Sequence, residues 1–315
     1  MNPASDQTLV LGADGGGTKT LGLLADRSGV VLARGMGEGS NQNVIGTDNA
    51  ALNLAGLIMN LAQTAGRSVS GIGSAVLGLA GAGSAKDRQV LAQAIQVRLH
   101  AMGHPPVPLS IVSDGRIALE GAFNGGPGVV AVAGTGSVVM GKSPDGSTIS
   151  IGGWGRVIGD EGSGYYIGLE ALKAVSREID GGGKAGRLRV SLSSRFGLET
   201  RERIIAAVYR EKFDIPSIAP AVLDAAEGGD AVALGILEAG AREFSAQIIA
   251  AVVRLGLSGG TGIVMAGGLI DNNTIYARIL AGEITKSSLA VDIRPPLNGP
   301  EHGALLLALA RLKGD

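Results

Sequence analysis

The chain has 315 residues, of which 53 are glycine, about 17 % against a usual ~7 %. It contains no cysteine, which excludes a disulfide framework, a thiolate zinc site, a Cys-ligated iron–sulfur cluster and a cysteine nucleophile. A formal net charge of −1 and only 3 % aromatic residues argue against a nucleic-acid partner. The 45 % of hydrophobic residues is typical of a folded chain, and the length suits about two domains.

Nothing in the sequence predicts membrane targeting. Residues 1–8 carry no basic run, and the apolar residues 9–11 are too few for a signal peptide. Residues 121–140 are uncharged and long enough to span a bilayer, but six glycines and a proline in this stretch break a helix. We therefore expect a soluble cytoplasmic protein.

Two stretches of the chain share one pattern. Residues 9–26 and 129–145 each contain an apolar run, a short turn of Gly, Thr or Ser, a second apolar run and a polar turn, which predicts a β-hairpin. Each hairpin is followed by another predicted strand, at 30–35 and 147–151. The spacing of about 120 residues indicates a duplicated domain.

Helices and strands alternate along the rest of the chain, which favours an α/β fold with mixed sheets. The predicted strands cover residues 74–79, 109–112 and 261–266. The predicted helices cover residues 47–64 with Thr47 as cap, 88–102 with Asp87 as cap, part of 113–124, 231–255 with Asp230 as cap, and 303–313. Another helix is expected to begin at Ser163 or Gly164, and loops are expected at 181–187 and 216–220.

The turns of the two hairpins are candidate phosphate sites. In the first, residues 15–17 are all glycine, which permits positive φ and lets backbone N–H groups converge on one ligand. Thr18 and Lys19 add a hydroxyl and a cation, and Asp14 is placed to hold a metal ion, so the turn suits Mg²⁺ with a polyphosphate. The alternative is a tight hairpin without a ligand. A second donor-rich turn at 134–137 weakens that alternative.

Two apparent nucleotide motifs are misleading. Residues 136–143 match the G-x-x-x-x-G-K-[ST] pattern, but that motif must lead into a helix, whereas the residues here are typical of a strand. Residues 12–17 do not suit a dinucleotide fingerprint, because residues 20–26 also continue as a strand.

Carboxylates and a tryptophan define a candidate sugar side. Asp114 follows a predicted strand, where a carboxylate faces the crevice of an α/β sheet, although capping the next helix is the commoner role. The glycine-rich segment 152–170 holds the only Trp, Trp154, together with Asp160 and Glu161. Carboxylates accept hydrogen bonds from sugar hydroxyls and flat side chains cover sugar rings, while compensation of a helix dipole is the alternative.

Two further segments are weaker candidates. Asn41 lies in a polar stretch after the third predicted strand and offers amide groups of the kind that sugars need, or forms a simple polar turn. Gly267 and Gly268 follow the strand 261–266 and precede a predicted helix, where they allow close approach of a flat ligand such as adenine, or form only a strand-to-helix turn.

Together these motifs resemble a known family. The segments ADGGGTKT, SNQNVIG, SDGRIALEGA, AVAGTGSVV, GGWGRVIGDEGSGYYIG and MAGGLIDN are similar to those of the BadF/BadG/BcrA/BcrD ATPase-type family. Within it, the chain is most similar to the N-acetylglucosamine and glucosamine kinase branch of the actin/hexokinase/Hsp70 superfamily. The resemblance covers residues 9–307.

The resemblance implies two ribonuclease-H-like, actin-like ATPase domains. Each would hold a mixed five-stranded sheet flanked by helices, with ATP and sugar in the cleft between the domains. We expect the N-terminal domain to comprise residues 1–117 and the last helix, 300–315, and the C-terminal domain to comprise residues 118–299.

The implied activity is ATP-dependent phosphorylation of the 6-hydroxyl of N-acetylglucosamine or glucosamine, with Asp114 as general base and Mg²⁺ organised through Asp14. The expected ATP and phosphate ligands are Gly15, Gly16, Gly17, Thr18, Lys19, Gly134, Thr135, Gly136, Gly267 and Gly268. The expected sugar ligands are Asn41, Asp114, Trp154, Gly155, Asp160 and Glu161.

Some questions stay open at this point. Animal N-acetylglucosamine kinases have Asn where this chain has Val138, which affects recognition near the sugar 2- and 3-positions. The alternatives are a kinase for another sugar, such as an anhydro-muramic acid or a hexose, and an ATPase switch or activator that phosphorylates no sugar. The family resemblance also implies a homodimer.

Overall fold

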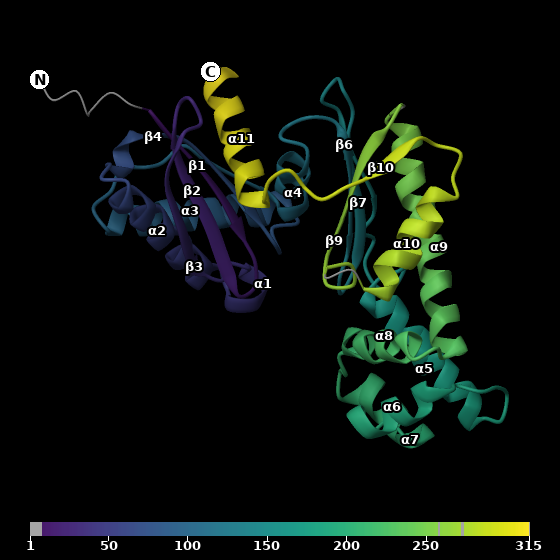
Figure 1. Ribbon diagram of the computed structural model, residues 1–315. Coiled ribbons are helices and arrows are strands. Elements are labelled where there is room, and N and C mark those ends of the chain that lie inside the picture. The colour runs from purple at the N-terminus through teal and green to yellow at the C-terminus, as the bar shows by residue number, and fades with distance from the viewer. Residues whose placement is uncertain (1–7, 258, 272–273, 315) are drawn as a thin grey trace, which may run out of the picture. The chain divides into compact units, whose positions relative to one another are not determined.

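The computed structural model describes residues 8–257, 259–271 and 274–314, and the chain divides into two compact units (Figure 1). Unit 1 takes in the described residues up to Gly126 and from Pro295 onward, and unit 2 runs from Pro127 to Arg294. The domain boundaries expected after residues 117 and 299 stay a prediction.

Unit 1 is built on a mixed five-stranded sheet with the order β3-β2-β1-β4-β5. β1 pairs antiparallel with β2 from Leu9 opposite Asp26 to Gly15 opposite Thr20, so the first predicted hairpin is confirmed. β4 and β5 continue the sheet in parallel with β1. The strands are β1 (Leu9–Gly15), β2 (Lys19–Asp26), β3 (Val31–Glu38), β4 (Ile72–Leu79) and β5 (Leu109–Ser113).

Helices cover both faces of this sheet (Figure 1). Leu9 and Leu11 of β1 pack in one cluster with α2 and α3, whereas Val10 joins α4 and α11 on the opposite face, because side chains alternate along a strand. The last helix therefore packs on unit 1, as expected. The helices are α1 (Gln42–Ile45), α2 (Thr47–Thr64), α3 (Ala85–Ala101), α4 (Asp114–Ala122) and α11 (Pro300–Gly314), with a 3₁₀ turn, η1 (Val69–Gly71).

Unit 2 repeats the arrangement with the order β10-β9-β6-β7-β8. Its hairpin β6–β7 and strand β8 correspond to β1–β3, and β9 and β10 correspond to β4 and β5. The expected α/β fold class with two mixed five-stranded sheets flanked by helices is thus confirmed, and the matching order supports the duplication. The strands are β6 (Gly128–Ala133), β7 (Ser137–Lys142), β8 (Thr148–Gly152), β9 (Thr261–Ala266) and β10 (Val291–Ile293).

The helices of unit 2 form one continuous core with the sheet face that carries Val129, Ala131 and Ala133. α9 lies along β6, β7 and β8. The prediction of a loop at residues 216–220 is wrong, because these residues form a 3₁₀ turn and the start of α8. The elements are α5 (Gly164–Ile179), α6 (Arg187–Phe196), α7 (Arg201–Ile205), a π-helical turn η2 (Ala206–Arg210), η3 (Ile215–Ile218), α8 (Ala219–Glu227), α9 (Ala231–Arg254) and α10 (Ile275–Thr285).

Two of the predicted helix caps are wrong. Ser84, not Asp87, caps α3, and its Oγ accepts a hydrogen bond from the N–H of Asp87 at 3.0 Å. Thr47 is the first residue of α2 and follows Gly46, which provides no side-chain cap. The cap at Asp230 is confirmed, because its carboxylate accepts from the N–H groups of Val232 and Ala233.

The uncharged stretch 121–140 forms the end of α4, all of β6 and much of β7. Residues 137–142 are therefore a strand, as interpreted from the sequence. Across the part of the chain that the structure describes, no helix combines the length and apolar character that crossing a membrane requires.

Gly12 generates a prediction about stability. A Cβ at Gly12 would overlap the backbone nitrogen of Leu305 in α11 and lie 2.7 Å from the carbonyl oxygen of Glu301. We expect Gly12→Ala to lower the free energy of unfolding by about 1–3 kcal/mol, because backbone atoms must move apart. Gly56→Ala, at an exposed position of α2 with open space around it, should raise it by roughly 0.5–1 kcal/mol. Urea titrations followed by circular dichroism compare both variants, and an unchanged Gly12→Ala would contradict the packing argument.

Candidate functional site

The turn of residues 15–19, here glycine turn 1, is held by backbone contacts. The N–H of Gly16 donates to the carbonyl of Lys19 at 3.0 Å, and its own carbonyl accepts from the N–H groups of Ser40 and Asn41 at 2.9 and 3.1 Å. None of the three glycines lies in the left-handed region, so the turn does not use the positive φ that glycine permits. Glycine is required at Gly15 because a Cβ there would overlap the Ser40 hydroxyl. Gly17 and Thr18 are exposed.

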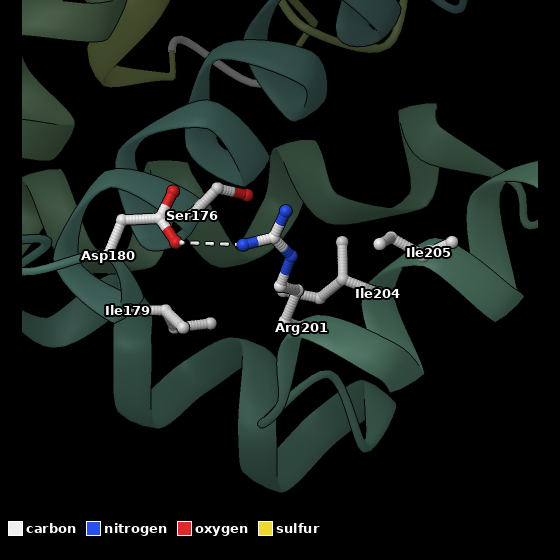
Figure 2. A pocket seen from close by; sticks show the side chains of 6 residues that line it. All are labelled: Ser176, Ile179, Asp180, Arg201, Ile204 and Ile205. Carbon is white, nitrogen blue, oxygen red and sulfur yellow. Dashed lines mark ion pairs between the residues drawn. The ribbon is translucent and has the colours of Figure 1, made fainter.

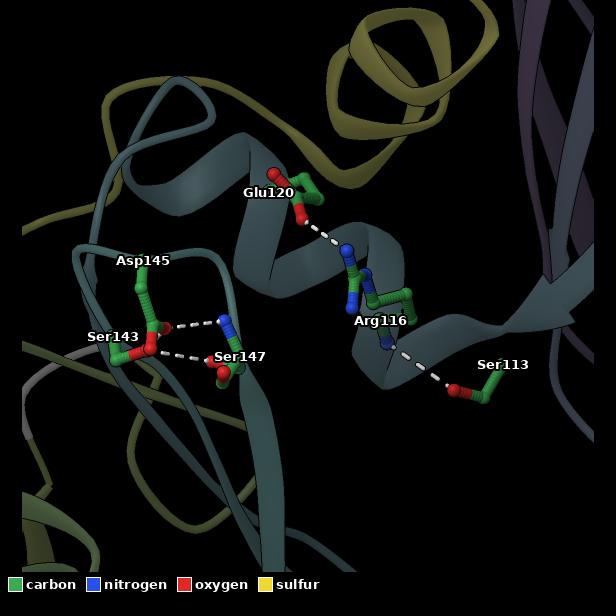
Figure 3. Close-up of polar contacts among 6 residues, drawn as sticks. All are labelled: Ser113, Arg116, Glu120, Ser143, Asp145 and Ser147. Atoms are coloured by element: carbon green, nitrogen blue, oxygen red, sulfur yellow. Dashed lines mark hydrogen bonds and ion pairs between the residues drawn. The ribbon is translucent and has the colours of Figure 1, made fainter. Parts of the chain in front are cut away.

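Asp114 stands at the same edge of the sheet as glycine turn 1, because β1 and β5 both run parallel to β4 and end there. It is the first residue of α4 and is exposed. Ser113 caps the helix instead, accepting from the Arg116 N–H at 3.3 Å, and Arg116 pairs with Glu120 one turn further on (Figure 3). The capping role considered for Asp114 is thus taken by its neighbour.

Three carboxylates influence one another at this edge. Burial, together with the negative charges of Asp114 and Glu301, raises the pKa of Asp14 from its ordinary 3.8 to about 6, while the positive charge of Lys19 opposes them. Glu301, in the first turn of α11, was not singled out in the sequence because it lies 287 positions beyond Asp14. The edge therefore concentrates negative charge, and a bound cation would relieve it.

Asn41 lies beside glycine turn 1. It caps the short helix α1, where its Oδ1 accepts from the Asn43 N–H at 3.0 Å. Its side chain also lies so close to Gly81 that no Cβ fits there. The structure thus brings Asn41, Asp14, Asp114 and glycine turn 1 to one edge of unit 1.

Residues 134–137, here glycine turn 2, occupy the corresponding edge of unit 2. Gly267 lies directly against it, with φ of +106° and with no room for a Cβ beside the Ala133 backbone. The carbonyl of Ala133 also accepts from the Leu269 N–H at 3.1 Å. At Gly268, by contrast, a Cβ would meet open space. The structure therefore joins glycine turn 2 with the Gly267–Gly268 turn.

The segment 153–163, here the tryptophan loop, is fastened to glycine turn 2. The Ser137 N–H donates to the Asp160 carboxylate at 3.3 Å, and the Ser137 hydroxyl donates to the Glu161 carbonyl at 2.8 Å. Beyond the loop, the N–H groups of Gly164 and Tyr165 donate to the carbonyls of turn residues 134 and 135 at 2.7 and 3.1 Å. Asp160 is therefore positioned over Gly136 and not out in solvent.

The remaining residues of the loop have different environments. Asp160 has φ of +61°, a conformation that costs a non-glycine residue about 1–3 kcal/mol and is typical of functional sites. Glu161 points to α9, where its carboxylate accepts from Gln247 at 2.8 Å. Trp154 is 73 % exposed, and Gly155, also exposed, has φ of +81°. Among the sugar residues expected in this loop, Asp160 is thus the one whose carboxylate contacts glycine turn 2. The Glu161 carboxylate is bonded to α9 instead.

A cavity of about 280 Å³ opens beside glycine turn 2. One wall is the turn itself, and the Arg156 guanidinium lies 5.8 Å from the centre of the Tyr165 ring. Its lining residues are Thr135, Gly136, Arg156, Asp160, Tyr165, Lys212, Phe213, Asp214, Ile215 and Pro216. Residues 212–216 were not identified from the sequence as part of a site. Their only signal was Pro216, which was interpreted as part of a loop.

A second cavity of unit 2, about 190 Å³, holds none of the expected site residues (Figure 2). Ile179, Ile204 and Ile205 supply apolar wall, and an ion pair of 3.6 Å joins Arg201 to Asp180 beside them.

The arrangement of carboxylates fits Mg²⁺ held through water. Within residues 8–257, 259–271 and 274–314, no three His, Cys, Asp or Glu side chains group closely enough to hold a metal ion by themselves. Mg²⁺ commonly keeps several waters and uses one or two carboxylates together with phosphate oxygens. Asp14, with its raised pKa and neighbouring carboxylates, is the residue that suits this role.

Comparison with known proteins places the chain in a family. The sequence model of the BadF/BadG/BcrA/BcrD ATPase family matches residues 11–308. The chain is 32 % identical over 270 residues to the N-acetylmuramic acid/N-acetylglucosamine kinase of Clostridium acetobutylicum, covering 85 % of this chain and 87 % of that one. It is 30 % identical over 316 residues to the N-acetyl-D-glucosamine kinase of Dictyostelium discoideum, covering 96 % and 98 %.

A solved structure extends the comparison to the fold. A candidate N-acetylglucosamine kinase of Chromobacterium violaceum has a TM-score of 0.69 and 26 % identity, covering 96 % of this chain and 99 % of that chain. The chain therefore belongs to the BadF/BadG/BcrA/BcrD ATPase family, and the predicted resemblance is confirmed.

The electrostatics of Asp14 predict a stability that depends on pH. Its pKa in the folded state exceeds the ordinary value, so folding loses stability as the pH rises from about 4 through 6 and the buried carboxyl ionises. We expect Asp14→Asn to raise the free energy of unfolding at pH 7.5 by about 1–2 kcal/mol and to have little effect on it below pH 4. The effect at pH 7.5 is smaller than the full pKa shift implies, because the carboxyl group is partly solvated.

Urea titrations at pH 4 and 7.5 in metal-free buffer test this expectation. Asp26→Asn is the control of opposite sign, because the Ser28 hydroxyl and nearby N–H groups hold the pKa of Asp26 below its usual value. Removing that carboxylate should destabilise unit 1 at pH 7.5. A loss of stability in Asp14→Asn at pH 7.5 would refute the burial argument.

Proposed function

We propose that the protein is an ATP-dependent amino-sugar kinase that transfers the γ-phosphoryl group to the 6-hydroxyl of N-acetylglucosamine or glucosamine. The carrying observation is Asp114, an exposed carboxylate at the carboxyl edge of the unit 1 sheet that is released from capping by Ser113. Family membership and two relatives named as N-acetylglucosamine kinases support the reaction class.

Asp114 would act as general base toward the sugar hydroxyl. Phosphoryl transfer passes through a loose transition state, so positioning and charge neutralisation dominate the catalysis. Asp114 would orient the hydroxyl and accept its proton late in the transfer. Asn41, at the same edge, would donate and accept hydrogen bonds with the other hydroxyls, and the Asp160 carboxylate of unit 2 would accept from them.

The backbone of the two glycine turns would hold the phosphates. Around turn 1 the exposed Gly17 and Thr18 leave donors accessible, and Lys19 supplies a positive charge. We propose that Mg²⁺, held by Asp14 through water, neutralises phosphate oxygens when it is bound. The open face of Gly268 suits the nucleoside part of ATP.

Several finer points belong to the same proposal. We expect Trp154 and Gly155 to cover a face of the sugar ring, and we expect a cytoplasmic homodimer, as the family resemblance implies. The Clostridium relative is named for N-acetylmuramic acid as well as N-acetylglucosamine, so a wider sugar range is a second candidate.

Removal of the base tests the assignment of Asp114. We expect Asp114→Ala to lower kcat for the sugar by about 10²–10⁴-fold, because the hydroxyl then loses its proton acceptor, while ATP still binds. Asp87→Ala, which removes an exposed carboxylate from the first turn of α3, is the matched control and should retain normal turnover. Near-normal turnover in Asp114→Ala would refute the assignment of Asp114 as general base.

A substrate panel tests the function itself. A coupled ADP-release assay compares N-acetylglucosamine, glucosamine, N-acetylmuramic acid, N-acetylmannosamine, glucose and a reaction without sugar. We expect release to depend on an amino sugar. Release that is the same with every sugar and with none would instead favour the ATPase-switch alternative.

A further inference from the structure

We infer that Gln247, in the middle of α9, is a positioning residue for the sugar side of the reaction and acts through Glu161. This inference rests on the proposed kinase function. It assigns Glu161 to holding the tryptophan loop in place and leaves Asp160 as the carboxylate that contacts sugar.

A long-range hydrogen bond joins the loop to α9. The Nε2 of Gln247 donates to the Glu161 carboxylate at 2.8 Å, and the two residues are 86 positions apart in sequence. Both are half-buried, where a hydrogen bond to a charged acceptor contributes more than one in water. The Oε1 of Gln247 is buried and accepts no hydrogen bond from the residues that the structure describes.

Glu161 is fixed at two of its atoms from two directions. Its carbonyl accepts from Ser137 in glycine turn 2, and its carboxylate accepts from Gln247. Gly162, which follows it, packs so tightly that a Cβ would lie 2.7 Å from the Gly240 carbonyl of α9. The end of the loop is therefore clamped between the turn and the helix.

The clamp explains how Asp160 keeps its strained conformation. Its φ of +61° persists only where the surroundings over-determine it. The bond from Ser137 to the Asp160 carboxylate is long, at 3.3 Å, and cannot supply this restraint by itself. The adjacent Glu161, held at 2.8 Å on both sides, supplies it together with the Ser163 N–H, which donates to the Asp160 carbonyl at 3.1 Å. Loss of the Gln247 bond would let Asp160 relax away from its position over Gly136.

Three variants test this role. Gln247→Met removes the donor and nearly keeps the shape, Glu161→Gln removes the charged acceptor, and the double variant Glu161→Gln with Gln247→Glu reverses the bond between the same two positions. The control is Gln96→Met in unit 1, because the Gln96 side chain of α3 also ties a helix to another segment, accepting from the N–H and donating to the carbonyl of Val107. Circular dichroism establishes that each variant folds.

The kinetic signature separates positioning from general destabilisation. For Gln247→Met we expect kcat/KM for the sugar to fall about tenfold, mainly through the KM of the sugar, with the KM of ATP changed less than threefold. The double variant should recover kcat/KM to within about threefold of the unaltered protein. Gln96→Met should leave both KM values unchanged even where it lowers the unfolding midpoint.

Trp154 provides a readout that needs no catalysis. It is the only tryptophan and lies in the loop against Gly159, where a Cβ would come within 3.0 Å of the Trp154 Cβ. We expect its fluorescence anisotropy to fall in Gln247→Met and to recover in the double variant. This measurement tests the loop restraint even if the substrate panel were to refute the kinase function.

Two results would overturn the inference. One is a Gln247→Met variant with the sugar KM and the anisotropy of the unaltered protein. The other is a double variant no better than Glu161→Gln, which would mean that the Glu161 carboxylate touches the sugar directly.

Discussion

Gly303 of α11 lies so close to the carbonyl of Ile117 in α4 that no side chain fits between the two helices. The same holds where Gly12 of β1 meets α11 and where Gly121 of α4 meets the carbonyl of Gly299. Close approach of backbone to backbone fixes α4 and α11 on one face of the unit 1 sheet. It thereby sets the positions of Asp114, which begins α4, and Glu301, which lies in the first turn of α11.

The two units share a strand order but carry different chemistry at corresponding edges. The edge of unit 1 gathers carboxylates, and their mutual repulsion together with burial raises the pKa of Asp14. The edge of unit 2 gathers backbone turns, the glycine pair 267–268 and a cavity with Arg156 and Lys212. A duplicated scaffold can divide a reaction in this way because the carboxyl ends of parallel strands present loops, whose residues can change while the sheet is kept.

Local patterns in the sequence predicted much of this structure, and contacts between distant residues did not follow from them. The hairpins and the placement of Asp114 after a strand follow from alternation and turn residues, and family motifs predicted the strand count. The cap predicted for α3 was wrong because Ser84 and Asp87 lie within one turn of each other, and the cap predicted for α2 was wrong because that helix follows Gly46 without a side-chain cap. Glycine is needed at position 15 because Ser40 packs against it, and φ preferences do not reveal that contact. The segment 212–216 reaches the cavity only through tertiary packing.

Glu161 shows why a motif by itself does not separate the tasks of adjacent residues. Adjacent carboxylates in a glycine-rich loop suggest that both bind the same ligand, and nothing nearby in sequence separates them. Adjacent side chains must nevertheless point in different directions, and the left-handed φ of Asp160 turns it toward glycine turn 2 while Glu161 meets α9. A strained residue needs a firmly held neighbour, since the free energy stored in its backbone otherwise drives relaxation. In the inferred arrangement the two carboxylates are complementary, because the position of Asp160 depends on the anchoring of Glu161.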